Sequence, residues 1–195
     1  MGQLGLHLRL TDQELVNIEA LPNSRAINEY ITEELEEAKF ESGDVAETEK
    51  SWAYIHAAMM GADPDGPLER EPSIFSQPSK GFFGKLFGTK EQASKPWRDT
   101  GRAKYVIIGV ETLVSDEDHF FGLTKKTDVG TVSSALGKIS SEELRRLVVQ
   151  SHERFEAMGD ARECAEYADS WFPGLVEFFR KTAERNEHVL FTVNF

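Results

Sequence analysis

Two histidines, a tryptophan and a glutamate are the residues of this 195-residue chain whose types suit a small-ligand site. His7 lies in an alternating apolar stretch, and His56 follows Trp52 by four positions, which places the two rings on one helical face where they can stack. Glu111 lies within an apolar run that we expect to be a strand. One hypothesis is therefore a small-ligand-binding protein or enzyme with a site near the strand ends around His7, Trp52, His56 and Glu111.

Metal and covalent chemistry receive little support from the sequence. The histidines lack close ligand spacing, and the single cysteine excludes a multi-cysteine metal site. Cys164 and His152 could act as nucleophile and base, but Cys164 shares an apolar stripe with Tyr167, which favours an inert core thiol. We expect no catalytic residue, no metal ligand and no cofactor.

Glutamates that recur every four residues form the first candidate surface for a protein partner. They are Glu29, Glu33, Glu37 and Glu41. On a helix this spacing puts like charges on one face, and each pair costs about 0.2–0.5 kcal/mol. Only Lys39 is near enough in sequence to relieve the repulsion. Either the face is merely solvated, or it binds a basic partner and the repulsion is tolerated because it steers association.

A segment rich in phenylalanine, glycine and lysine, residues 80–90, is the second candidate surface. Its large apolar residues are Phe82, Phe83, Leu86 and Phe87. They either fold back onto the domain or form an exposed hook that grips a partner or touches anionic lipid.

Charge narrows the classes of partner. The chain carries a net charge of −12, with twelve acids against four bases in residues 1–60 and seven bases against two acids in residues 80–104. Phosphates would be repelled, so we expect a basic protein as partner and no nucleic acid. No apolar run approaches the roughly 18 residues of a membrane span, and no signal peptide is recognisable. We therefore expect a cytoplasmic protein without integral membrane contact.

Hydrophobic periodicity predicts the elements that position these residues. Alternation predicts strands at 4–10 and 188–195, a β-branched run predicts a buried central strand at 105–114, and 119–123 reads as a short strand. Capping boxes are expected at Thr11 and at Asp44, the latter opening the Trp52 helix, and Thr124 is expected to cap another helix. Pro173 is expected to start the last helix.

Together these elements predict an α+β fold. We expect a single domain over 1–195, with a small mixed sheet that includes both terminal strands and about seven packed helices. Because each terminal strand has an apolar face and needs sheet neighbours, the two chain ends should lie side by side. Residues 62–103 form an irregular excursion that holds five of the seven prolines.

Four short motifs, in this order and spacing, carry a family resemblance. They are Leu8-Arg9-Leu10 followed by Thr11-Asp12, then Lys50-Ser51-Trp52 with Ile55-His56, then Phe121-Gly122-Leu123-Thr124 followed by Ser140-Ser141-Glu142-Glu143-Leu144, and finally Val189-Leu190-Phe191. The chain resembles the YfbM-like family of small bacterial proteins, whose function is unknown. Relatives often have histidine directly after the tryptophan, where this chain has Ala53. The resemblance implies the fold and a bacterial setting, but no reaction.

The first functional hypothesis is thus a non-enzymatic, cytoplasmic protein-binding domain with an acidic face. An immunity-like or antitoxin-like role fits, because an acidic surface neutralises a basic toxin well. The small-ligand or enzymatic site is the alternative.

Overall fold

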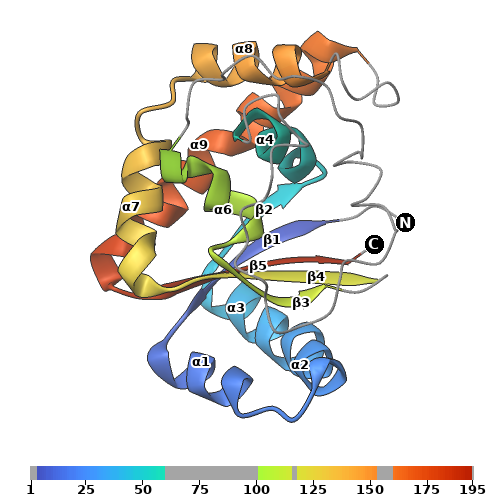
Figure 1. Cartoon of the computed structure of the whole chain (residues 1–195), viewed down its shortest axis with the longest axis vertical. Helices are drawn as coiled ribbons and strands as arrows, with labels where there is room; N and C mark the ends of the chain where they lie inside the picture. The colour runs from blue at the N-terminus through green and yellow to red at the C-terminus, as the bar shows by residue number, and fades with distance from the viewer. Residues whose placement is uncertain (1–3, 60–100, 116–117, 153–159, 195) are drawn as a thin grey trace, which may run out of the picture.

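A five-stranded sheet with helices on both faces forms the body of the molecule (Figure 1). The computed structural model describes residues 4–59, 101–115, 118–152 and 160–194. The strands, in the spatial order β2-β1-β5-β4-β3, are β1 (Gly5–Leu10), β2 (Val45–Glu49), β3 (Glu111–Ser115), β4 (His119–Thr124) and β5 (His188–Asn194). All four pairings are antiparallel, where the sequence had suggested a mixed sheet. The α+β class is confirmed.

The two chain ends lie side by side, as predicted. Strands β1 and β5 pair in continuous register from Gly5 opposite Val193 to Leu10 opposite His188. Each of them also has a second neighbour, so both are interior strands of the sheet. The chain thus closes its sheet with its last strand.

One helical layer covers the first face of the sheet (blue in Figure 1). It contains α1 (Asp12–Glu19), α2 (Ser24–Tyr30), the π-helical turn η1 (Ile31–Leu35) and α3 (Glu36–Ser42). Alternate leucines of β1 pack here against Leu15, Ile18, Ile31 and Leu35. The predicted capping box of α1 is confirmed, with the Thr11 hydroxyl accepting from the Glu14 amide and the Glu14 carboxylate accepting from the Thr11 amide.

The larger helical layer covers the other face of the sheet (Figure 1). Its elements are α4 (Ser51–Met59), the 3₁₀ turn η2 (Gly101–Lys104), α6 (Tyr105–Ile108), α7 (Lys126–Leu136), α8 (Ser141–His152) and α9 (Ala161–Arg185). The largest buried side chains between this layer and the sheet include Phe120 and Phe191 from the strands and Trp52 and Phe179 from the helices. Because helices cover both faces, every residue of β1 is buried.

Four predictions about individual elements were wrong. Residues 45–49, expected to follow a cap and join a helix, form strand β2, and the Trp52 helix begins only at Ser51. The expected central strand at 105–114 divides into helix α6 and edge strand β3. Pro173 lies inside the 25-residue helix α9 rather than at a helix start. Thr124 ends β4, and Lys125 is the N-cap of α7.

Glycine permits the sharp change from α6 to β3. Gly109 has φ +69°, a conformation that L side chains rarely adopt, and it ends α6. Gly122 of β4 lies against the end of α6. If it carried a side chain, the Cβ atom would lie 2.3 Å from the carbonyl oxygen of Ile108. The close approach of α6 to the sheet therefore requires glycine at position 122.

Candidate functional site

His7 and Trp52 lie in the interior between the sheet and the larger helical layer. The His7 side chain on β1 is 0% exposed and contacts the rings of Phe178, Phe179 and Phe191. The Trp52 ring lies 5.9 Å from the Phe191 ring, centroid to centroid. Phe191 is thus the neighbour that the two side chains share.

The His7 ring is held neutral by its surroundings. Burial lowers the pKa of His7 to about 4, and a hydrogen bond with the Val106 carbonyl only partly opposes this. The His7 Nε2 lies 2.9 Å from that carbonyl oxygen, so Nε2 carries the proton and donates it. A neutral imidazole in an aromatic cage can donate this hydrogen bond, but it is poorly placed to exchange protons with solvent.

The four predicted small-ligand residues do not form one cluster. His56 on α4 is buried, like His7 and Trp52. Glu111 is exposed on edge strand β3, separated from β1 by β5 and β4, and it pairs with Lys125 at 3.2 Å. The structure therefore places three of the residues in the interior and the fourth at the far edge of the sheet.

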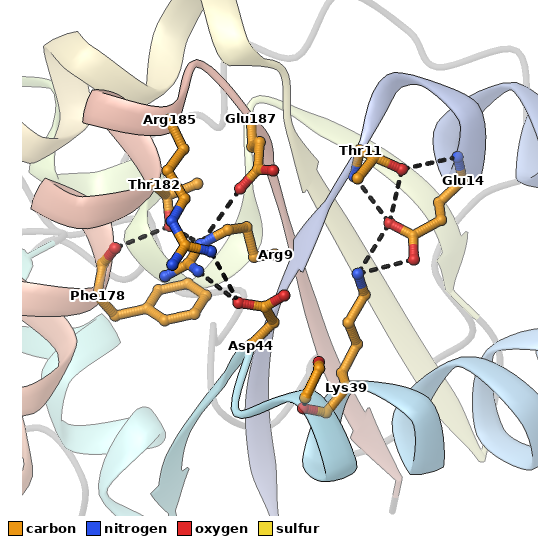
Figure 2. Close-up of polar contacts among 10 residues, drawn as sticks. Arg9, Thr11, Glu14, Lys39, Asp44, Phe178, Thr182, Arg185 and Glu187 are labelled. Atoms are coloured by element: carbon orange, nitrogen blue, oxygen red, sulfur yellow. Dashed lines mark hydrogen bonds and ion pairs between the residues drawn. The ribbon is translucent and has the colours of Figure 1, made fainter.

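A buried arginine, which the sequence analysis named only as part of the first family motif, joins three parts of the chain (Figure 2). Arg9 is 4% exposed, and its guanidinium lies 2.5 Å from an Asp44 oxygen and 3.5 Å from Glu187. It donates to the Thr182 hydroxyl and lies over the Phe178 ring. Arg185 also pairs with Asp44. A buried charge needs such partners, and this group ties β1 to α9 and to the loop that follows α3.

A second charged contact in Figure 2 sets the orientation of α3. Lys39 was expected to relieve the repulsion among the glutamates, but it is buried, and its Nζ lies 2.7 Å from Glu14 on α1. Glu36 is also turned inward, where its Oε1 accepts a 2.7 Å hydrogen bond from the Thr192 hydroxyl. Burial raises the pKa of Glu36. These two contacts fix which side of α3 faces solvent.

Glu29, Glu33, Glu37 and Glu41 are all exposed on the outer side of this layer. We call these four residues the acidic face. Arg25 pairs with Glu29 at 2.8 Å, while Glu33, Glu37 and Glu41 make no ion pair with the residues that the structure describes. Among the described residues, three carboxylates of the acidic face are thus without an ion-pair partner.

The π-helical turn keeps the acidic face aligned. An α-helix has about 3.6 residues per turn, so positions four apart drift by about 40° at each step. The π turn at Ile31–Leu35 is wider, because its hydrogen bonds span five residues, so each residue rotates less about the helix axis and the angular drift becomes smaller. The same correction keeps Ile31, Leu35 and Lys39 buried, whereas Ala38 is exposed.

Phe40 is a feature of the acidic face that the sequence analysis missed. It is 46% exposed on α3, three residues after Glu37 and next to Glu41. Positions three apart are neighbours on a helix surface. The inward contacts of Lys39 and Glu36 set the rotation of α3 about its axis, and in that rotation Phe40 points outward.

The other predicted surface, Phe82, Phe83, Leu86 and Phe87, lies outside the described residues. Within the ranges that are described, no three His, Cys, Asp or Glu side chains are grouped to hold a metal ion. In the same ranges, no helix is both long and apolar enough to cross a membrane.

Comparison with known proteins agrees with this fold. The family model of a domain of unknown function, DUF1877, matches residues 1–192. The solved structure of YfbM from Escherichia coli, a protein of unknown function, is similar with a TM-score of 0.55 and 13% sequence identity. That match covers 98% of this chain and 99% of YfbM. No curated protein matches the sequence. The chain therefore belongs to the DUF1877 family, a YfbM-like family of unknown function.

Proposed function

We propose that this protein is a protein-binding domain whose acidic face, with Phe40, binds a basic surface of another protein. The observation that carries this proposal is that Glu33, Glu37 and Glu41 are exposed, lie near the exposed Phe40 ring, and make no ion pair with any residue that the structure describes. Carboxylates at spacings of four cost helix stability, and inward contacts of Lys39 and Glu36 hold the face in that arrangement.

The chemistry of the partner follows from the same residues. Glu33, Glu37 and Glu41 would attract lysine and arginine side chains and speed the encounter. Phe40 supplies an apolar contact and a ring face on which an arginine can stack. A cytoplasmic, bacterial protein of immunity-like or antitoxin-like type, which neutralises a basic toxin, is the form of this function that we favour.

The small-ligand or enzymatic hypothesis has less support. His7 and His56 are buried. Glu111 lies on edge strand β3, and strands β5 and β4 separate it from β1. These positions would require the interior to open before a ligand could contact the histidines.

A photo-crosslinking experiment tests the proposal. The crosslinking amino acid p-benzoylphenylalanine replaces Phe40 in one chain and Val149 in a matched control, because Val149 is 37% exposed on α8 in the other layer. We expect the residue at position 40, and not the one at 149, to crosslink one basic protein in a native lysate, with a yield that falls as salt rises. Equal crosslinking from both positions would contradict the proposal.

A further inference from the structure

Helix α7 begins without a side-chain cap of its own. Its N-cap residue, Lys125, makes no side-chain capping hydrogen bond. Instead the backbone N–H of Lys126 donates to Nδ1 of His188, the first residue of β5, at 3.1 Å. A distant strand thus satisfies one of the free N–H groups that every helix start presents.

The other ring nitrogen of His188 binds a third element. Because Nδ1 accepts from Lys126, the proton of the neutral ring lies on Nε2, which donates to the Asp12 carboxylate at 2.9 Å. The Lys126 ammonium lies 2.7 Å from both Asp12 oxygens. Asp12, Lys126 and His188, here called the His188 junction, therefore connect the first residues of α1, α7 and β5.

We propose that the His188 junction is a proton-sensitive joint that releases the start of α7 when the imidazole takes up a proton. The cationic ring carries hydrogen on both nitrogens. Its Nδ1–H would then face the Lys126 N–H, two donors without an acceptor, so this contact must break. The positive end of the α7 dipole also disfavours a cation at this position.

The surrounding charges decide which side of the joint opens. Asp12 attracts an imidazolium, and hydrogen bonds from Lys126 and His188 already lower the pKa of Asp12. On the α7 side, Lys125 pairs with Glu19 and Glu111, and Asp128 pairs with Arg102. Glu187, the residue before His188, pairs with Arg9. The imidazolium therefore keeps its contact with Asp12, which already accepts from Nε2, and the contact that breaks is the backbone one at the first turn of α7.

Nuclear magnetic resonance on the whole chain tests this proposal without any mutation. Between pH 8 and pH 5, where histidines take up protons, we follow the His188 ring nitrogens and the exchange rate of the Lys126 amide, corrected for its intrinsic pH dependence. We expect the Nε2–H tautomer at pH 8 and roughly fivefold faster exchange once the ring is protonated, the effect of losing one hydrogen bond. An Nδ1–H tautomer at pH 8, or ring protonation without faster exchange, would overturn the proposal.

Two variants provide a matched comparison. His188→Asn places a carbonyl oxygen near the position of Nδ1, where it accepts from Lys126 at every pH, so the corrected exchange rate should no longer depend on pH. His119→Asn removes a half-buried histidine from β4 and should leave the response of Lys126 intact. Persistence of the acceleration in His188→Asn would show that another group causes it.

Discussion

The buried histidine of β1, His7, is the residue from which we predict a response of the fold to acid. His7 is enclosed by aromatic rings and donates the single N–H of its neutral ring to the Val106 carbonyl. Charging this ring requires the removal of an imidazolium from water without a carboxylate partner. The cost appears as the lowered pKa of about 4 in the folded chain, against 6.5 for an ordinary histidine.

We predict that the folded state loses stability as the pH falls from 6.5 to 4. Over that range the unfolded chain binds a proton at His7 that the folded chain does not, so the His7 contribution is complete above pH 6.5 and lost by pH 4. The shift corresponds to about 3 kcal/mol. Urea unfolding at a series of pH values measures the free energy of unfolding.

The control for this prediction is His7→Gln. The glutamine amide can still donate to Val106 but does not titrate, so the variant should show a shallower loss of stability over the same range. An identical pH dependence in both proteins would mean that the acid sensitivity arises elsewhere.

Residues on the acidic face illustrate what sequence can and cannot predict at this scale. The four-residue spacing suggested a solvent-facing row of glutamates, and Glu29, Glu33, Glu37 and Glu41 are all exposed. The positions of Lys39 and Phe40 were not predictable in the same way, because a lysine is normally exposed and a phenylalanine normally buried. Here Lys39 is buried and Phe40 is exposed, and this reversal depends on a long-range contact, the ion pair of Lys39 with Glu14.

At the scale of elements, the sequence predicted the helices and strands that are determined by local signals. It missed those that form only because another part of the chain packs or pairs against them. The α1 capping box and the alternating apolar residues of β1 and β5 were read correctly. Strand β2 has the half-polar sequence Val-Ala-Glu-Thr-Glu and exists because it pairs with β1. Tyr105–Ile108 has β-branched residues but is helical, because Gly109 turns the chain and Gly122 lets the helix approach.

Helix α9 shows the same competition between local and tertiary effects. Proline inside a helix costs about 3 kcal/mol, which favours a boundary at Pro173. The helix continues because apolar residues on both sides of the proline, among them Ala168, Phe172 and Leu175, are buried in one core.

Glycine substitutions test the account of the elements. We predict that Gly122→Ala severely destabilises the fold, because its Cβ would meet the Ile108 backbone at 2.3 Å, where no flexible side chain can yield. Gly130→Ala is the matched control, since its Cβ has nothing within 4 Å on α7, and it should stabilise by up to about 1 kcal/mol. Thermal unfolding measures both effects, and equal destabilisation by the two variants would contradict the packing described for α6.

At the scale of the whole molecule, the sheet is completed only by the last strand. β5 lies between β1 and β4, and its residues enter both cores, with Leu190 on one face and Phe191 on the other. The side-by-side position of the chain ends was predictable from their apolar faces, whereas the direction of pairing and the complete strand order were not, because several arrangements satisfy the same pattern.

Deletion of residues 190–195 should therefore abolish cooperative folding. The truncation leaves β1 and β4 without their common partner and uncovers both cores. Asn194→Ala, at the exposed end of the same strand, should unfold much like the parent protein. Circular dichroism during thermal denaturation measures both, and a cooperative transition in the truncated chain would contradict this architecture.

The whole-molecule claim is that one face of the α1–α3 layer binds a basic protein, and charge reversal tests it most directly. Glu33→Lys with Glu37→Lys is compared with Glu163→Lys with Glu166→Lys, which changes the net charge equally at exposed positions of α9. Binding of each folded protein to the partner crosslinked at Phe40 is measured by calorimetry at two salt concentrations. We predict that the first pair of substitutions abolishes binding and that the α9 pair preserves it. Retained binding in the first variant, or equal loss in both, would contradict the assignment of this face.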